Sequence, residues 1–143
     1  MSWLYNGHEI TELPEDCVGF VYCIENLVDN RKYVGKKLAN FSKTTYKTVT
    51  LKNGTKKRKK IRGKIESDWK DYYSSSDELK SDVALHGKHN FKREILRLCK
   101  DKNECNYYEA KLQFDNDVLI KDDWYNSWIM VRVRKSKSLS NSN

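Results

Sequence analysis

Long apolar runs are missing from this sequence of 143 residues. The longest, Cys17 to Ile24, contains eight residues and includes a glycine, whereas a membrane-spanning helix needs about 20. The N-terminus also lacks the basic and then apolar segments of a secretory signal peptide. We therefore expect a cytoplasmic protein.

The four cysteines lack the spacing of a zinc site. Cys17 and Cys23 are separated by five residues, as are Cys99 and Cys105, whereas paired zinc ligands usually have about two to four residues between them. Disulfides are disfavoured in a reducing compartment. We predict free and mostly buried thiols.

Acidic residues are absent from one segment that is rich in basic ones. The chain has 28 Lys and Arg against 20 Asp and Glu, a net charge of +8. Residues 52–64 carry eight of the cations and no acid, so the remaining 20 basic and 20 acidic residues balance. The eight are Lys52, Lys56, Lys57, Arg58, Lys59, Lys60, Arg62 and Lys64. Charge concentrated in this way indicates a polyanionic partner, most simply nucleic acid.

The hydrophobic patterns predict an α+β fold with a small central antiparallel or mixed β-sheet flanked by helices. Residues 18–24 and 32–35 are β-rich and enclose a polar turn, which is typical of an antiparallel hairpin. Residues 91–99 form a third predicted core strand, and residues 124–131 a final loop and strand. We expect residues 1–17 to be an N-terminal arm, 18–131 the folded domain and 132–143 a basic, polar, disordered tail.

Capping patterns place the predicted helices. Ser67 is suited to cap a short helix to Tyr73, and Ser75 with Glu78 has the spacing of a capping box for a helix that ends at Gly87. Asp101 with Glu104 opens a longer helix through Val118.

The basic segment is predicted to be an inserted hairpin. Residues 46–51 alternate as a strand does, and Asn53-Gly54 is a strong hairpin-turn signal. The return arm is expected over 55–61 and to end at Gly63.

One carboxylate lies on the apolar face of the predicted long helix. On a helical period, Glu109 shares its face with Cys105, Tyr108 and Leu112. A buried carboxylate needs a cation, hydrogen-bond donors or a metal ion as its partner. The alternative is a glutamate at the edge of the face that reaches solvent.

The paired hairpin motifs resemble those of the GIY-YIG nucleases. Gly19-Phe-Val-Tyr22 and Lys32-Tyr-Val-Gly35 are ten residues apart, and they are followed by Asn90-Phe91, a helix with Tyr107-Tyr-Glu-Ala110, and Tyr125-Asn126. Glu66 to Trp69, Tyr73 to Ser76 and Phe91 to Leu96 resemble blocks of the phage-encoded, seg-type homing endonucleases. The resemblance covers roughly residues 18–131.

This resemblance implies metal-dependent hydrolysis of a DNA phosphodiester, with the DNA expected to be double-stranded. One divalent ion, Mg²⁺ or Mn²⁺, would be held by Glu109. Tyr22 and Tyr33 would lie beside the scissile phosphate, and one of them would orient or deprotonate the attacking water. Asn126 would brace the catalytic strands. A phage-encoded protein would act in the host-cell cytoplasm.

A phenol needs a nearby cation to act as a base at neutral pH, because its ordinary pKa is about 10. Lys36 and Lys37 directly follow the second motif and could lower it. Ordinary solvated lysines are an equal alternative.

The sequence departs from the family at two positions. Phe20 stands in place of a motif glycine, a change expected to alter strand packing rather than chemistry. Aligned on Trp69, Asp68 occupies the position of a functional arginine and Tyr72 that of a His or Tyr. Asp cannot replace a phosphate-binding guanidinium. Either a nearby cation replaces it, with Arg62 preferred over Lys64, or catalysis is impaired.

Three functions follow from these features. The first is a nuclease whose hairpin grips DNA phosphates, with the contacts expected from Lys36, Lys37, Lys56, Lys57, Arg58, Lys59, Lys60 and Lys64. The second is a degenerate nuclease scaffold that only binds nucleic acid, which Asp68 would favour. The third, a module that docks an acidic protein, is disfavoured because Glu109 and both tyrosines are present. Basic residues of the tail could add a second DNA contact.

Overall fold

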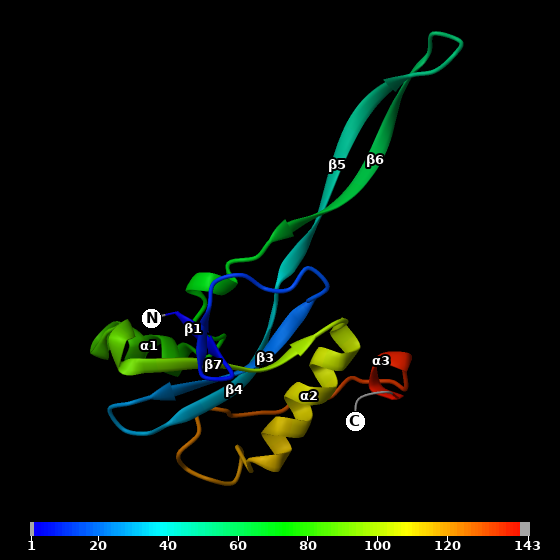
Figure 1. The fold of residues 1–143 in the computed structure, drawn as a ribbon. Coiled ribbons are helices and arrows are strands. Elements are labelled where there is room, and N and C mark those ends of the chain that lie inside the picture. Colours follow the sequence, from blue (N-terminus) through cyan, green and yellow to red (C-terminus); the bar gives the residue numbers. More distant parts are fainter. Residues whose placement is uncertain (1, 141–143) are drawn as a thin grey trace.

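A mixed five-stranded sheet with helices on both faces forms the body of the protein, and a separate two-stranded hairpin projects from it (Figure 1). The computed structural model describes residues 2–140. The sheet order is β2-β1-β7-β3-β4, from strands β1 (Trp3–Tyr5), β2 (His8–Ile10), β3 (Gly19–Asn26), β4 (Lys32–Leu38) and β7 (Phe91–Cys99). Its helices are α1 (Asp77–His86), α2 (Lys102–Asp115) and the short α3 (Lys137–Ser140), with 3₁₀ turns at Trp69–Asp71 and Lys88–Asn90. The predicted α+β class is confirmed.

Alternation along β3 divides the core between the two faces of the sheet. Phe20, Tyr22 and Ile24 pack on one face, against α1 and the turn at Trp69. Val21 and Cys23 lie on the other face, in a smaller core with Cys99 and Cys105 and with α2 above them. All four thiols are free, and Cys17, Cys99 and Cys105 are fully buried, as predicted.

The first residues are part of the sheet, which corrects the expected N-terminal arm. β1 pairs parallel with β7 through Leu4 and Tyr5. Trp3 is 1% exposed, stacks edge-to-face on Phe20 and Tyr22, and donates from its indole nitrogen to the carbonyl of Trp69 at 2.7 Å. The sequence signal was weak because a three-residue strand is too short to show a period.

Helix boundaries differ from the predictions at three places. Ser76 rather than Ser75 caps α1, since its side chain accepts from the Leu79 N–H. Ser67 does not cap a helix: its hydroxyl donates to the carbonyl of Leu38, and only a 3₁₀ turn follows. Asp101 caps α2 as predicted, but the helix ends at Asp115, before Val118.

The C-terminal segment is irregular rather than a strand. Within residues 124–131, the strand-like pairing in the described chain is a single bridge between Trp124 and Lys32. Further on, Asn103 of α2 hydrogen-bonds the backbone N–H and C=O of Arg134. Part of the expected disordered tail therefore lies against α2, and residues 141–143 fall outside the described residues. No helix among the described residues is long and apolar enough to span a membrane.

The inserted hairpin is longer than predicted. β5 (Asn40–Thr50) and β6 (Lys56–Glu66) pair along their whole length, and Gly63 lies inside β6 opposite Lys43 instead of ending it. The predicted turn at Asn53-Gly54 is confirmed: Gly54 has a φ of 82°, and the Asn53 side chain accepts from the Thr55 N–H at 2.9 Å.

Replacement of Trp3 by Ala tests whether the N-terminal strand belongs to the core. We expect Trp3→Ala to lower the free energy of unfolding by about 3–5 kcal/mol, because a buried aromatic ring leaves a cavity when removed. Urea denaturation measures the change. Leu85→Ala, at a side chain that is 75% exposed, serves as the control and should cost less than about 0.5 kcal/mol. Equal effects of the two substitutions would show that the arm does not support the domain.

Candidate active site

The site is built on the open edge of β4, the last strand of the sheet. An edge strand has backbone groups without strand partners, and these must be satisfied in another way. Asn126 fills this role at Val34, whose N–H donates to its Oδ1 at 3.1 Å and whose C=O accepts from its Nδ2 at 2.8 Å. Gln113 of α2 donates to the same carbonyl at 2.9 Å. Two residues further along β4, the Lys36 N–H donates to the carboxylate of Glu109.

A pocket of about 700 Å³ opens along this edge. Tyr33, Lys36, Glu109 and Asn126 line it together, so four of the predicted site residues meet there. The remaining lining comes from the start of α1, from α2 and from residues 125–132, which follow α2. These residues are Ser75, Ser76, Asp77, Glu78, Asn106, Gln113, Tyr125, Ser127, Trp128, Met130 and Arg132. Tyr33 packs with the α1-side core, whereas Glu109 comes from α2. The pocket therefore wraps around the strand edge and draws on both faces of the sheet.

The two hairpin tyrosines are neighbours but have different surroundings. Their ring centroids lie 6.2 Å apart. Tyr22 is fully buried and does not line the pocket, whereas Tyr33 is partly exposed and its hydroxyl lies 3.2 Å from that of Ser75. Gly35 makes the arrangement possible, because a Cβ there would lie 2.7 Å from the Tyr22 hydroxyl and 2.7 Å from Cε1 of Tyr33.

Burial keeps both phenols protonated. Desolvation raises the pKa of Tyr22 well above its usual range, with further contributions from the neighbouring phenols Tyr72 and Tyr33. Desolvation also raises the pKa of Tyr33, and its hydrogen bond to Ser75 opposes the rise. In the protein alone, both side chains are therefore neutral hydrogen-bonding groups at neutral pH.

Glu109 has the partner that its position on the helix predicted. Burial raises the pKa of its carboxyl group, and the Lys36 charge and backbone N–H both oppose the rise. Asn106, one turn earlier on α2, accepts from the Lys36 ammonium group. Lys36 thus joins β4 to α2 through two separate bonds.

The Glu109 carboxylate suits a divalent ion that keeps part of its water shell better than an ion coordinated entirely by protein side chains. Among residues 2–140, no three His, Cys, Asp or Glu side chains cluster as metal ligands. Mg²⁺ typically keeps several waters and binds one or two carboxylates together with substrate phosphates. The Glu109 carboxylate at the wall of an open pocket fits that mode of binding.

A family model now gives this geometry a context. The model described as "Putative endonuclease segE, GIY-YIG domain" matches residues 3–129. The chain belongs to the seg-type GIY-YIG family. The comparisons with curated proteins and with solved structures found no match. The match begins in β1, in agreement with the place of Trp3 in the core.

Lys37 and Tyr72 of the GIY-YIG domain lie beside the tyrosine pair rather than in the pocket. The Lys37 ammonium group is 2.6 Å from the Asp68 carboxylate and lies 4.2 Å from the centroid of the Tyr72 ring. That hydrogen bond lowers the pKa of Asp68. Tyr72 packs edge-to-face on Tyr22 at 5.9 Å. Asp68, at the position where the family resemblance predicts an arginine, therefore pairs with Lys37, and no arginine of this turn lines the pocket.

Arg62 is not brought to the pocket. It is exposed on β6 opposite Thr44. This is four positions along the strand from Asn40 and Glu66, the residues that face each other at the base of the hairpin. At about 3.3 Å per residue this is roughly 13 Å along the strand. Lys64 and the other predicted DNA-binding residues of β6 (Lys56, Lys57, Arg58, Lys59 and Lys60) are likewise exposed on the hairpin.

Arg132 lines the pocket, and the motif pattern did not point to it. It lies beyond the predicted domain, in the segment expected to be disordered. Asn106 donates to its backbone carbonyl at 3.3 Å, and Asn103, one turn away on α2, holds Arg134. The asparagines share a helical spacing with Glu109, and that spacing is the signal that could have indicated a bound segment.

The raised pKa of Glu109 predicts a stability difference that depends on pH. A carboxyl group that holds its proton more tightly when folded destabilises the fold once it ionises. In metal-free buffer, Glu109→Gln should therefore raise the melting temperature at pH 7–8. Below about pH 4, near the ordinary pKa of Glu, the advantage should vanish.

Thermal unfolding across this pH range measures the effect. Glu12→Gln, at an exposed position in the loop after β2, is the control and should change stability by less than about 0.5 kcal/mol. A Glu109→Gln protein that is less stable than wild type at pH 8 would contradict the burial of this charge.

Proposed function

We propose that this protein is a DNA endonuclease that hydrolyses a phosphodiester with the help of one divalent ion. The observation that supports it best is the meeting of the Glu109 carboxylate and the Tyr33 phenol in one pocket on the open edge of β4. Membership of the GIY-YIG family supports nuclease chemistry and a DNA substrate. Residues from both faces of the sheet supply the acidic and the phenolic parts of this site.

Glu109 would hold the ion, Mg²⁺ or Mn²⁺, and the ion would stabilise the negative charge that develops on the phosphate. Of the motif tyrosines Tyr22 and Tyr33, Tyr33 lines the pocket and Tyr22 does not. Tyr33 is therefore the residue assigned to orient the attacking water. Tyr22 is a positioning residue, because it is buried behind Tyr33 and packs on its ring. Asn126 keeps β4 in place through Val34.

Arg132 is assigned the cationic role that Asp68 cannot fill. The pocket is lined by two cations, Lys36 and Arg132, and the Lys36 ammonium group is already bonded to Asn106. A guanidinium can bind two phosphate oxygens at once. Arg132 is therefore the group best placed to contact the substrate phosphate, and Arg62 is assigned to DNA binding on the hairpin.

A binding module without catalysis is the second candidate. The Lys37–Asp68 pair favours it, because the position of the family arginine is occupied by an acid that is itself neutralised. The two candidates differ in whether Glu109 is needed for any reaction.

Removal of the Glu109 carboxylate tests the proposed chemistry. Wild-type protein should nick or cut plasmid DNA with Mg²⁺ or Mn²⁺, and Glu109→Ala should cut at least about 100-fold more slowly, as when a main charge-stabilising group is lost. Asp115→Ala, at an exposed carboxylate at the end of the same helix, is the matched control and should cut normally. Intact DNA with wild type, or equal cutting by Glu109→Ala, would contradict the proposal.

Replacement of Arg132 separates the two arginine assignments. Arg132→Ala should lower the rate of cleavage at saturating DNA by about 100-fold and leave DNA binding nearly intact. Arg134→Ala, two residues away on the same segment, is the control for general charge loss. The assignment fails if Arg134→Ala impairs cleavage as much, or if Arg62→Ala is the variant that abolishes the rate at saturation.

A further inference from the structure

The register of the β5–β6 hairpin sorts its cations by face. Side chains directly opposite each other share a face, and successive residues of a strand alternate between faces. Thr48 lies opposite Arg58 and Thr44 opposite Arg62. One face, here called the basic face, therefore carries a cation at each of its β6 positions from Lys56 to Lys64, namely Lys56, Arg58, Lys60, Arg62 and Lys64, and its last β6 position, at the base of the hairpin, is Glu66. The Arg58 guanidinium lies 4.4 Å from the centroid of the Tyr46 ring, which belongs to the same face.

The opposite face, here called the mixed face, has a different composition. Phe41 lies opposite Ile65 and Thr45 opposite Ile61, and Val49 lies nearer the turn. Its cations are interspersed with these apolar groups and are Lys43, Lys47, Lys57 and Lys59. The contiguous block of the sequence thus separates into two surfaces once it folds.

The apolar cross-strand pairs that stabilise the hairpin lie on the mixed face. A two-stranded hairpin in water is marginally stable, and apolar cross-strand pairs such as Phe41–Ile65 stabilise it. On the basic face, cations on alternate residues of β6 repeat about every 6.7 Å. Their mutual repulsion opposes folding, so the row of charge is explained by a partner rather than by the hairpin itself.

The basic face also carries hydroxyl donors between its charges. Four hydroxyl residues of β5 lie opposite cations of β6: Ser42, Thr44, Thr48 and Thr50. No acidic residue occurs within residues 42–64. Lysine, arginine and hydroxyl groups are the side chains that bind phosphate oxygens. The five cations lie within nine residues of strand, roughly 27 Å from the first to the last, which is about three quarters of the 34–36 Å of one duplex turn.

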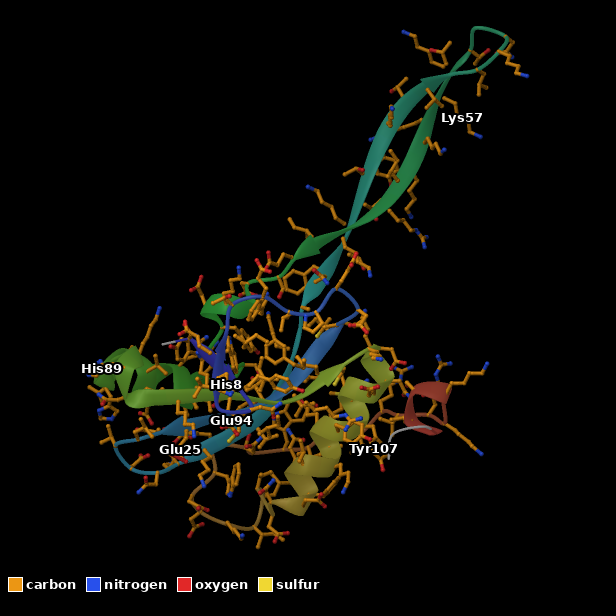
Figure 2. All side chains as sticks on the ribbon, viewed as in Figure 1. His8, Glu25, Lys57, His89, Glu94 and Tyr107 are labelled. Carbon is orange, nitrogen blue, oxygen red and sulfur yellow. The ribbon has the colours of Figure 1, made fainter. Side chains whose placement is uncertain are left out.

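We propose that the basic face of the hairpin lies along the phosphate backbone of double-stranded DNA, with the mixed face turned away. The hairpin extends far from the body of the protein, and Lys57 marks its distal part in Figure 2. An extended row of charges matches a stiff polyanion, and duplex DNA has that stiffness over this length. The inference rests on the proposed function for its DNA substrate, and it assigns affinity rather than sequence recognition to the hairpin.

Two variants with the same charge change test which face binds. One replaces Lys56, Arg58, Lys60 and Arg62 by Gln, and the other replaces Lys43, Lys47, Lys57 and Lys59 by Gln. Each loses four positive charges from the same hairpin. Binding to a short DNA duplex is measured in EDTA, where a metal-dependent enzyme does not cut, over a range of salt concentrations.

The basic-face variant should flatten the dependence of log K on log salt by about 3–4, at about 0.9 per lost phosphate contact. The mixed-face variant should change this slope by less than about 1. Melting curves of both variants confirm that the body is folded. Equal losses in the two variants would overturn the assignment of a face, and unchanged slopes in both would show that DNA lies elsewhere.

Plasmid cleavage by wild type with Mg²⁺ is measured in parallel, so that the two proposals can fail separately. If wild type cuts but the faces are equivalent, the face assignment is wrong and the nuclease assignment stands. If the faces differ but wild type never cuts, the hairpin binds DNA on a protein that is not a nuclease.

Discussion

The open edge of β4 is the constraint on which the site depends. Its backbone groups need partners, and the molecule supplies them from side chains of α2 and of the segment after it: Gln113 and Asn126 at Val34, and Glu109 at Lys36. The same bonds that complete the sheet therefore place the carboxylate beside Tyr33. A shift of α2 along β4 would therefore break the hydrogen bonds that complete the sheet edge and would also move Glu109 away from Tyr33.

The protein consists of a compact body that holds the pocket and the projecting β5–β6 hairpin that holds most of the excess positive charge. The body holds Glu109, Tyr33 and the cations Lys36 and Arg132 around one pocket, while the hairpin carries a row of charge that its own stability does not require. The net charge of +8 is thus concentrated on an element with little core of its own. Such an element can bind a polyanion without disturbing the geometry of the pocket.

Local patterns predicted most of the strands and the α2 cap, because alternation, the Asn53-Gly54 turn and Asp101 act within a few residues. Tyr33, Glu109 and Asn126, which the family resemblance singled out, line one pocket in the structure. Long-range features were missed. Trp3 joins the sheet through a strand of three residues, and Arg132 reaches the pocket only because Asn106 binds its backbone. The strand at Trp3 is too short to show a period, and the sequence signal for the segment with Arg132 is the helical spacing of Asn103 and Asn106.

The central claim is that Glu109 and the edge of β4 form a divalent-ion site. The most direct measurement is the NMR spectrum of isotope-labelled protein during titration with Mn²⁺, whose unpaired electrons broaden signals from nearby nuclei. The account predicts that the amide signals of Lys36, Glu109 and Asn126 broaden first, and that Glu109→Gln removes this effect. Broadening centred on another part of the molecule, or broadening that persists in Glu109→Gln, would contradict it.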